Sequence, residues 1–287
     1  MNKLKVHWIL LRPFAAAGVL VSMLLGFLLA GANDITTFII AFIGSAFILF
    51  GVHYHNSLSD FLKGIDRGET AKAYTAASEI LPKGYATVME VLLGTLILYA
   101  AGIVVWTWIA ITTTPLALIP PLIGMGCGVA YNTFGKYKGL GEVLLALAFG
   151  LASTLAGYVP VARTITLTPV LAALIPGILF GLFYTIDQWQ DKDRDSKLGI
   201  VNIAIILSRR NFPISRYLEF GFFVALIVHL YLILLGILPA MTFLSIAATP
   251  LMFLAVLTAD TDPRLSSVYT LLVFGFYVVL MDIGLIL

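Results

Sequence analysis

The sequence has little charge, four histidines and a single cysteine among its 287 residues. Charged residues make up 11% of the chain, whereas soluble domains carry about 25%. This shortage excludes an ordinary soluble fold, and the mean hydropathy of +1.02 indicates an integral membrane protein. The lone Cys127 excludes a disulfide framework and a cysteine-based metal site. The net charge of +2 gives no sign of a nucleic-acid partner, and we expect none.

Long uncharged runs are abundant instead. A helix that spans a bilayer needs about 20 mostly apolar residues, so the uncharged stretches 91–130 and 220–259 are each long enough for two helices. Pro115 and Pro239 divide them, because proline interrupts a helix. Only helices or closed barrels satisfy backbone polar groups in lipid, and no strand-like alternation competes. The sequence thus predicts an all-α, polytopic membrane protein that forms one domain over residues 1–287. Its nine spans are 14–32, 36–54, 88–113, 116–132, 142–160, 167–187, 217–237, 240–259 and 266–286.

The positive charges fix an expected orientation. If the N-terminus is cytosolic, all of the 17 Lys and Arg residues except Arg163 lie in cytosolic segments. Such a bias is typical of the cytosolic side of membrane proteins. We therefore expect a cell-membrane protein with a cytosolic N-terminus and an outside C-terminus. The two long loops, 55–87 and 188–216, then face the cytosol.

Each long loop begins with an acidic cluster that continues a span. Residues 56–66 read NSLSDFLKGID, and residues 187–199 read DQWQDKDRDSKLG. In the second cluster, three aspartates recur every four residues, which places them on one gently winding helix stripe. In the first, Asn56, Asp60 and Lys63 share a helix face. Gly64 is a plausible helix break, and such a break would let Asp66 turn back toward Asp60.

Two facing stripes of carboxylates need a cation between them. Like charges about 4 Å apart repel by roughly 4 kcal/mol at an effective dielectric near 20. Carboxylate and amide oxygens, without His or Cys, suit Mg²⁺, which completes its shell with water and substrate phosphates. The pattern predicts a Mg²⁺ site that holds a diphosphate. The predicted metal ligands are Asn56, Asp60, Asp66, Asp187, Asp191 and Asp195.

These motifs resemble those of the UbiA superfamily of intramembrane aromatic prenyltransferases, which has nine helices and acidic motifs after helices two and six. The motif form is nearest to the 1,4-dihydroxy-2-naphthoate branch, the menaquinone and vitamin K type. NSLSDFLKGID fits the first motif at Asn56, Asp60, Phe61, Gly64 and Asp66. LRPF at 11–14 and YNTFGKYKGLGE at 131–142 are similar to two further family stretches.

The second motif fits the family pattern less completely. Asp191, Asp195 and Gly199 match it, while Asp187 and Gln188 stand where two asparagines are usual. The resemblance covers essentially the whole chain. It implies a central cavity, cytosolic cap loops and transfer of a polyprenyl group to an aromatic acceptor in lipoquinone (menaquinone-type) biosynthesis.

The resemblance also implies roles for individual residues. The donor would be an isoprenyl diphosphate such as geranylgeranyl diphosphate, with Mg²⁺ as cofactor and an allylic carbocation that a lipophilic or aromatic acceptor captures. The expected catalytic residues are Asp60, Asp66, Asp191 and Asp195. The expected substrate-binding residues are Asn56, Lys63, Arg67, Tyr131, Asn132, Lys136, Lys138 and Asp187.

Several alternatives stay open. A glycerophosphate-type acceptor, as in ether-lipid synthesis, fits the same donor chemistry, and a non-catalytic isoprenoid-binding or transport protein is a third reading. Lys136 and Lys138 are two positions apart, so we expect only one to point inward. Arg12 fits either the site or the membrane interface. Residues 70–81 read as a short cytosolic helix, either a lid over the diphosphate or a surface helix.

Overall fold

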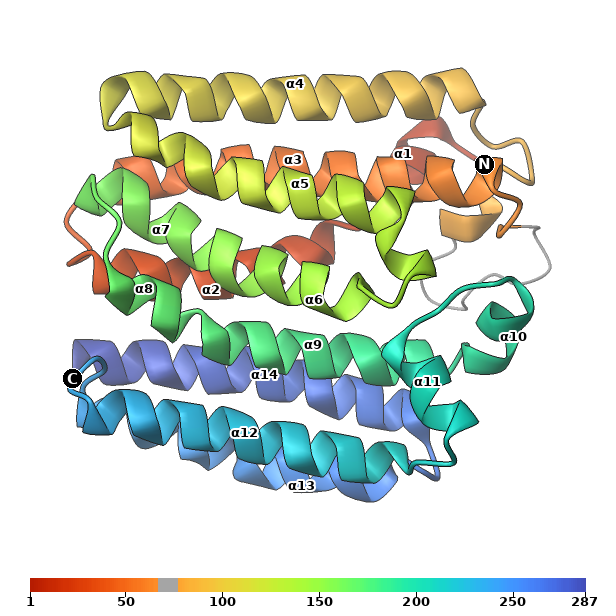
Figure 1. The fold of residues 1–287 in the computed structure, drawn as a ribbon. Coiled ribbons are helices and arrows are strands. Elements are labelled where there is room, and N and C mark those ends of the chain that lie inside the picture. Colours follow the sequence, from red (N-terminus) through yellow and green to blue (C-terminus); the bar gives the residue numbers. More distant parts are fainter. Residues whose placement is uncertain (67–76) are drawn as a thin grey trace.

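The computed structural model describes residues 1–66 and 77–287, which form helices and no strand. Within this described part of the chain, nine segments are long and apolar enough to cross a membrane, which confirms the predicted fold class. They lie side by side as one bundle (Figure 1).

The nine spans comprise α1 (Lys3–Leu11), η1 (Pro13–Ala15) and α2 (Ala16–Leu29); α3 (Ile35–Leu62); α4 (Val88–Thr112); η3 (Pro115–Leu118) and α5 (Ile119–Thr133); α6 (Gly141–Ala146), η5 (Leu147–Ala152) and α7 (Ser153–Ala162); α8 (Leu167–Ala172) and α9 (Leu174–Trp189); α12 (Ile214–Leu234); η6 (Ala240–Ala248) and α13 (Thr249–Thr258); and α14 (Pro263–Ile286). The connections carry η2 (Ala77–Glu79), η4 (Gly135–Tyr137), α10 (Lys192–Lys197) and α11 (Ile203–Arg209). Within the fifth span, η5 is a π-helical segment that joins α6 to α7.

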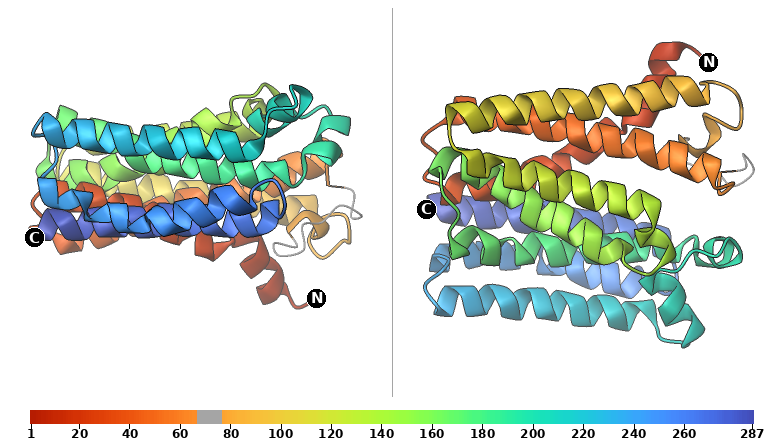
Figure 2. Two further views of the ribbon diagram at one scale, coloured as in Figure 1. Left: turned by 90° about the horizontal axis from the view of Figure 1, so that it is seen from below. Right: turned by 45° about the horizontal axis from the view of Figure 1, so that its top comes forward.

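The first span begins earlier than predicted and is kinked. We expected it to start at residue 14, but α1 precedes it and ends at Leu11. Pro13 lacks a backbone N–H and disfavours a helical residue before it. Arg12 accordingly adopts a left-handed conformation, with φ 49° and ψ 57°. As a result α1 turns away from the axis of α2 (Figure 2).

The second span is longer than predicted. We expected it to end at residue 54, but α3 continues for 28 residues to Leu62. A helix of that length extends about 42 Å, which exceeds the roughly 30 Å thickness of the hydrocarbon layer. Its last turns, which carry the polar residues Asn56 and Asp60, are therefore the part that we expect to lie beyond the apolar layer.

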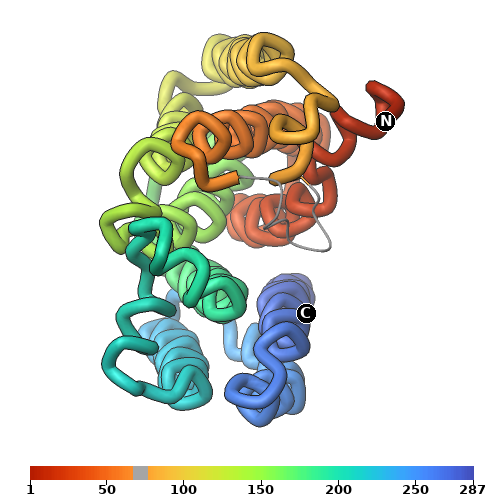
Figure 3. The backbone as a smooth tube through the Cα atoms, turned by 90° about the vertical axis from the view of Figure 1, so that its right-hand side faces the viewer, coloured from red at the N-terminus to blue at the C-terminus, as the bar shows by residue number. Residues whose placement is uncertain are grey.

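The spans form a ring around the centre of the bundle. Helix α2 packs on α3, α3 on α5, α5 on η5, α6 on α9, α9 on α14, and α14 again on α2. Helices α4, α12 and α13 pack on the outside of this ring. We call the end that carries residues 56–66 and 187–199 the motif end; it lies at the right in Figure 1 and faces the viewer in Figure 3.

The ring is closed at the opposite end by α7. This helix packs against both α2 and α3. At its contact with α2, a Cβ atom added to Gly157 would overlap the carbonyl oxygen of Met23, and one added to Gly26 would overlap that of Thr154. Glycine on both sides lets the two backbones touch, which fills the space between the helices without side chains. Among the described residues, this contact closes the ring between α2 and α7 at the end opposite the motifs.

Candidate active site

A cavity of about 320 Å³ lies inside the ring at the motif end. Its size falls within the range of about 300–1,000 Å³ that is typical of small-molecule sites. Both acidic motifs reach it, Asp60 and Asp66 from the first and Asp187 and Asp195 from the second. Cations reach it as well, namely Arg12, Lys136 and Arg194. The rest of the wall combines apolar and aromatic side chains with uncharged polar ones such as Asn56, Asn132 and Gln188.

The first motif reaches the cavity through a helix end and a turn. Asn56 and Asp60 are one turn apart on α3, and the helix stops two residues after Asp60. Gly64 has φ 71°, a left-handed conformation that glycine adopts without strain. The chain then reverses, so that the backbone N–H groups of Ile65 and Asp66 donate to the carbonyl of Asp60 at 2.8 and 3.4 Å. The predicted break at Gly64, with Asp66 turned back toward Asp60, is confirmed.

Asp60 forms an ion pair inside the cavity. Its partner is Lys136 of η4, and both side chains are largely buried. The segment that carries Lys136 is tied to the second motif loop, since Val201 donates its N–H to the Lys136 carbonyl at 3.3 Å and Gly139 donates to the Val201 carbonyl at 2.9 Å. This pairing holds Lys136 between the two motifs.

The neighbouring carboxyl group has an altered pKa. Burial, and then the negative charge of Asp60, raise the pKa of Asp66 to about 7. Lys136 and Arg12 act in the opposite direction but do not cancel these effects. A carboxyl group with this pKa takes up a proton readily at neutral pH, and a bound cation would favour its ionised form. The carboxylate crowding predicted from the sequence is therefore present around Asp60 and Asp66.

The second motif does not form the continuous helix that we predicted. Helix α9 ends at Trp189, and α10 starts at Lys192 with Asp191 as its N-cap residue. The prediction that Asp187, Asp191 and Asp195 line one helix stripe is therefore wrong. Beyond Trp189 the sequence has no apolar face to pack on the bundle, and its aspartates are poor helix formers that favour helix starts.

This break divides the three aspartates. Asp187 and Asp195 line the cavity, while Asp191 lies outside its lining. The Oδ2 atom of Asp191 is 3.6 Å from Nη2 of Arg194. Arg194 also donates from Nε and Nη2 to Oδ1 of Asp195, at 2.9 and 2.7 Å. The second motif thus brings a guanidinium group into the cavity together with its carboxylates, which the sequence reading did not anticipate.

The structure places Arg12 at the cavity, a position that the sequence left open. It lies at the kink between α1 and α2, in a conformation that costs a non-glycine residue energy. The charges of Asp60, Asp66 and Asp187 all act on its guanidinium group. Its Nε atom is buried without a hydrogen-bond partner among the described residues. The kink after Leu11, marked in the sequence only by Pro13, therefore aims a cation at the carboxylates.

Asn132 connects α5 to α3 beneath the cavity. It is fully buried, its Oδ1 accepts from Nδ2 of Asn56 at 2.9 Å, and its Nδ2 donates to the Val52 carbonyl at 3.1 Å. Ser59 donates to the carbonyl of Asn132 at 2.8 Å. Both amides were predicted to bind substrate, and both line the cavity. The bond to Asn132 uses the amide nitrogen of Asn56, so the oxygen is the atom that suits a metal.

Two predicted phosphate-binding lysines point elsewhere. Lys63 donates to the carbonyls of Asn132 and Thr133, both at 2.9 Å, and its Nζ lies 4.2 Å from the ring centre of Tyr137. It therefore caps the end of α5 instead of lining the cavity. Lys138 is exposed on the surface, whereas Lys136 is buried, so one lysine of this pair points inward, as expected from their spacing.

Tyr131 joins the cavity wall through a hydroxyl pair. Its Oη lies 2.6 Å from that of Tyr184 on α9, and both residues line the cavity. Tyr184 is three residues before Asp187, so the pair sits beside the second motif. Nearby, buried Glu142 accepts from the backbone N–H of Ile203 at 2.8 Å, which anchors the start of α11 over this side of the site.

The predicted lid falls mostly outside the described residues. Residues 70–76 of this predicted helix, and Arg67 before it, lie outside the described residues. Of the segment 70–81, Ala77–Glu79 form a single 3₁₀ turn, and Ser78 lines the cavity. Ile80 and Leu81 are buried against the cluster of α1, α3 and α4.

The carboxylate and amide oxygens that line the cavity suit a hard metal cation that both the protein and a bound ligand coordinate. Among the residues that the structure describes, no three carboxylate, imidazole or thiol groups come together closely enough to hold a metal by themselves. Carboxylates instead face the cavity from two motifs, with the Asn56 amide one helical turn from Asp60 in the first motif. Mg²⁺ is commonly held by one or two carboxylates, with phosphate oxygens and water as its other ligands. The arrangement suits such a bridged ion better than a closed protein cage.

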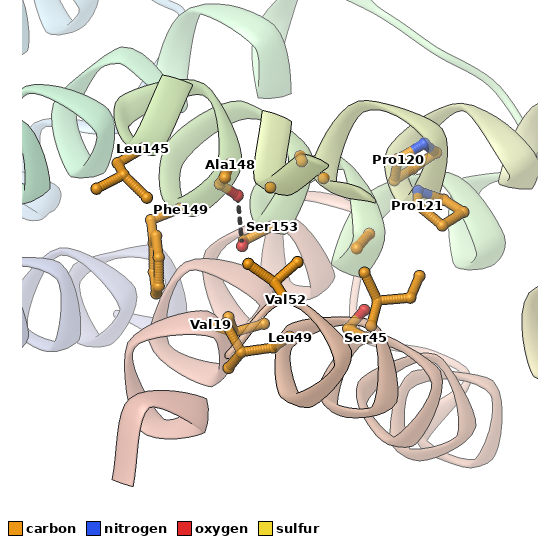
Figure 4. Close-up of a pocket in the computed structure, with 15 residues that line it drawn as sticks. Val19, Ser45, Leu49, Val52, Pro120, Pro121, Leu145, Ala148, Phe149 and Ser153 are labelled. Carbon is orange, nitrogen blue, oxygen red and sulfur yellow. Dashed lines mark hydrogen bonds between the residues drawn. The ribbon is translucent and has the colours of Figure 1, made fainter. Parts of the chain in front are cut away.

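A smaller, apolar chamber of about 70 Å³ adjoins the cavity (Figure 4). Helices α2 and α3 form one side of it, and α5 and the α6–η5–α7 segment form the other. Phe149 of η5 lines both spaces and stacks on Phe180 of α9, with ring centres 3.6 Å apart. The polar cavity thus continues into a hydrocarbon-lined space inside the bundle.

Comparison with known proteins agrees with this architecture. The model of the UbiA prenyltransferase family matches residues 19–280. No curated protein matches the sequence significantly. A solved structure described as digeranylgeranylglyceryl phosphate synthase in membranes is 21% identical, with a TM-score of 0.67 over 100% of this chain and 99% of that one.

Two archaeal UbiA homologues are similar as well. The one from Archaeoglobus fulgidus, solved with DMAPP and Mg²⁺, is 18% identical, with a TM-score of 0.62 over 96% of this chain and 99% of that one. The apo homologue from Aeropyrum pernix K1 is 18% identical, with a TM-score of 0.68 over 96% of this chain and 98% of that one. At these identities the structures establish the shared fold.

Proposed function

The chain belongs to the UbiA prenyltransferase family, and from this premise we propose that it transfers a prenyl group from an isoprenyl diphosphate, held at the motif end, to a lipophilic acceptor. The observation that carries the proposal is the cavity itself. It gathers four carboxylates from the two motifs, and three cations, above an apolar chamber. A diphosphate joined to a hydrocarbon chain matches both parts at once.

The two motifs would hold the diphosphate through Mg²⁺. Asp60 and Asp66 would act from one side and Asp187 and Asp195 from the other, with the Asn56 amide oxygen beside the first pair. When bound, Mg²⁺ supplies positive charge that stabilises the leaving diphosphate. The homologue from Archaeoglobus fulgidus, whose structure holds DMAPP and Mg²⁺, supports an isoprenyl diphosphate and Mg²⁺ as the ligands. Asp191 stays a predicted ligand that would have to turn away from Arg194 to join them.

The cations would bind the remaining phosphate oxygens. Arg12, Lys136 and Arg194 all line the cavity. Lys136 and Arg194 are each paired with a carboxylate of the site, and charges that are already positioned cost little reorganisation when the substrate arrives. As the bond between the prenyl carbon and the diphosphate breaks, these groups would take up the charge that develops on the leaving oxygen.

The apolar part of the cavity would protect the allylic carbocation. Phe149, Phe180, Phe183 and the Tyr131–Tyr184 pair form much of its wall. Aromatic faces attract cations, and an apolar wall excludes the water that would otherwise capture the carbocation. The carbocation would then persist long enough to react with the acceptor, which gives up a proton as the new bond forms.

Two acceptor classes compete. The motif resemblance favours a naphthoate-type aromatic acceptor and a menaquinone-type product. The similarity to digeranylgeranylglyceryl phosphate synthase favours a glycerophosphate-type lipid alcohol about equally. A glycerophosphate acceptor adds an anionic group to a cavity that already takes a diphosphate, so it would need a cation beyond those that bind the donor.

The test uses purified protein in detergent with labelled geranylgeranyl diphosphate and Mg²⁺. Acceptors of both classes, 1,4-dihydroxy-2-naphthoate and geranylgeranylglyceryl phosphate, are offered separately. Mg²⁺-dependent product that is lost in Asp60→Ala but kept in Asp193→Ala would support the proposal, because the Asp193 side chain is 87% exposed. The acceptor consumed names the class. Turnover that is independent of Asp60 would contradict the proposed site.

A further inference from the structure

His53 carries the only imidazole among the described residues that line the active-site cavity. It lies on α3, three residues before Asn56 and seven before Asp60. Seven residues complete nearly two helical turns, so His53 and Asp60 point within about 20° of one another and lie roughly 10 Å apart along the axis. One turn earlier on α3, Leu49 lines both the cavity and the apolar chamber. His53 therefore lies between the carboxylates and the apolar part of the site.

One of the two ring nitrogens of His53 is committed to the backbone. Its Nδ1 atom lies 2.7 Å from the carbonyl oxygen of Leu11, the last residue of α1. A carbonyl oxygen can only accept a hydrogen bond, so Nδ1 carries the proton of this bond. The bond satisfies a carbonyl that the end of α1 would leave without a helical partner. It also fixes the tautomer and the orientation of the ring.

The other ring nitrogen is available to a ligand. Nε2 makes no hydrogen bond to any described residue, and neighbouring atoms do not enclose it completely. In the neutral ring with its proton on Nδ1, Nε2 carries a lone pair. The cations of the cavity have no lone pair to offer, and the Tyr131 and Tyr184 hydroxyls bond to each other. His53 is thus the group of the cavity wall that is best suited to accept a proton from a substrate.

The proposed reaction releases a proton that must be removed. When the acceptor shares an electron pair with the allylic carbocation, the new bond leaves a positive charge on the acceptor. This charge lies on the ring of an aromatic acceptor or on the hydroxyl oxygen of an alcohol. The proton of such an adduct is strongly acidic, so a neutral imidazole can take it without being a strong base. The step needs a lone pair within hydrogen-bond reach of the acceptor.

We propose that His53 is the general base that removes the acceptor proton through Nε2. The inference rests on the proposed function, since it requires a prenyl carbocation formed in this cavity. The bond between the prenyl carbon and the diphosphate oxygen breaks, and its electron pair stays on the oxygen. The acceptor then gives an electron pair to the carbon, and its proton moves to Nε2. The imidazolium passes this proton to the departing diphosphate, which restores the neutral ring.

His53→Asn separates this catalytic role from a structural one. The amide nitrogen of asparagine can replace Nδ1 as the donor to the Leu11 carbonyl, but asparagine has no basic nitrogen. His55→Asn is the matched control, because His55 lies on the same helix and does not line the cavity. Its Nδ1 instead lies 3.4 Å from the hydroxyl of Tyr99 on α4.

The experiment compares the wild type and both variants in detergent with Mg²⁺ and geranylgeranyl diphosphate. It measures the dissociation constant of this donor, the rate of transfer to 1,4-dihydroxy-2-naphthoate or geranylgeranylglyceryl phosphate, and the ratio of prenylated product to free geranylgeraniol. We expect His53→Asn to lower the transfer rate about 10²–10⁴-fold, the usual contribution of general acid–base catalysis, and to leave donor binding unchanged. Water should capture more of the carbocation, so the ratio of product to geranylgeraniol should fall. His55→Asn should behave like the wild type.

The outcomes separate this inference from the proposed function. If the wild type forms no prenylated product that depends on Asp60, the proposed function fails. If the wild type forms product and His53→Asn keeps its rate, another group takes the proton and the inference is overturned. A loss of donor binding in His53→Asn, or an equal loss of transfer in His55→Asn, would show a structural role and overturn it too. His53→Gln also lacks a basic nitrogen and keeps the test decisive if the asparagine variant does not fold.

Discussion

The two ends of the bundle fill the space between helices in opposite ways. Opposite the motifs, Gly26 and Gly157 let the backbones of α2 and α7 touch, and no side chain fits between them. At the motif end, neighbouring helices are joined by polar groups such as the Asn132 network and the Lys136–Asp60 pair, around an open cavity of about 320 Å³. Close packing at one end holds the ring together, so the other end can remain hollow.

The difference shows how the bundle accommodates charge. Buried carboxylates and cations weaken a fold unless each is paired, and a hollow forfeits packing energy. The polar cavity at the motif end combines both costs, since it is hollow and lined by buried charges. The contact between α2 and α7 at the opposite end involves no charged group and leaves no room for a side chain. Substitutions at the two ends should therefore affect different properties, activity at one and stability at the other.

The largest effect is expected from Asp60→Asn. The change removes a negative charge from the proposed Mg²⁺ site and leaves Lys136 without its partner. We expect prenyl transfer to fall about 10²–10³-fold, the size of loss seen when one preorganised electrostatic contact is removed. The measurement is the initial rate in detergent at saturating Mg²⁺. The matched control is Asp193→Asn, whose side chain lies in solvent; a similar loss in both variants would contradict a specific role of Asp60.

Gly157→Ala should disrupt the close contact between α2 and α7. Its methyl group would overlap the Met23 carbonyl, so α2 and α7 must separate. We expect a loss of about 3 kcal/mol in stability, the upper part of the usual range for overpacking, seen as a lower midpoint of thermal unfolding in detergent. Gly126→Ala adds the same methyl group to an open position of α5 and should not lower the midpoint, since alanine favours a helix more than glycine does. An unchanged midpoint in Gly157→Ala would show that the contact does not support the fold.

Arg12→Gln should act on donor binding alone. Hydrogen bonds to charged groups contribute about 1.5–3 kcal/mol, so we expect geranylgeranyl diphosphate to bind roughly 10- to 100-fold more weakly. The thermal midpoint should change little. Arg210→Gln is the control, because Arg210 is an exposed cation on the same side of the bundle. If Arg12→Gln binds the donor like the wild type, the kink at residue 12 serves only the membrane interface.

The smallest effect concerns pH. The pKa of Asp66 is raised to about 7 by burial and by the charge of Asp60. Below pH 7 this carboxyl group binds a proton that Mg²⁺ must displace, and above pH 7 it is ionised and ready to bind the ion. Apparent Mg²⁺ affinity should therefore fall about tenfold between pH 8 and pH 6. Asp66→Asn should remove this dependence, and an unchanged pH profile in that variant would exclude Asp66 as its source.

Local features of the fold could be predicted from the sequence. Hydropathy located nine spans, because each apolar helix of about 20 residues satisfies its own backbone in lipid. The turn at Gly64 was predictable because glycine adopts the left-handed conformation that reverses the chain. The choice between Lys136 and Lys138 followed in part, since two residues so spaced cannot share one direction. Each of these depends on residues that are neighbours in the chain.

Other features depended on contacts between distant segments. The position of Arg12 in the cavity depends on how the kink at Pro13 is placed relative to α3 and α9, which lead into the two motifs. The separation of Asp191 from Asp187 and Asp195 arises because α9 loses its packing partners after Trp189. The four-residue spacing of these aspartates gave no sign of that loss.

The sequence by itself therefore determined the number of membrane spans, the chemistry of the two motifs and the turn that brings Asp66 back to Asp60. The tertiary structure alone decided which charges face one cavity, that Gly26 and Gly157 close the far end, and that a chamber beside Phe149 continues the site. The physical reason is that helix formation in lipid and tight turns are decided within a few residues. Cavities and ion pairs between helices depend instead on how whole helices pack.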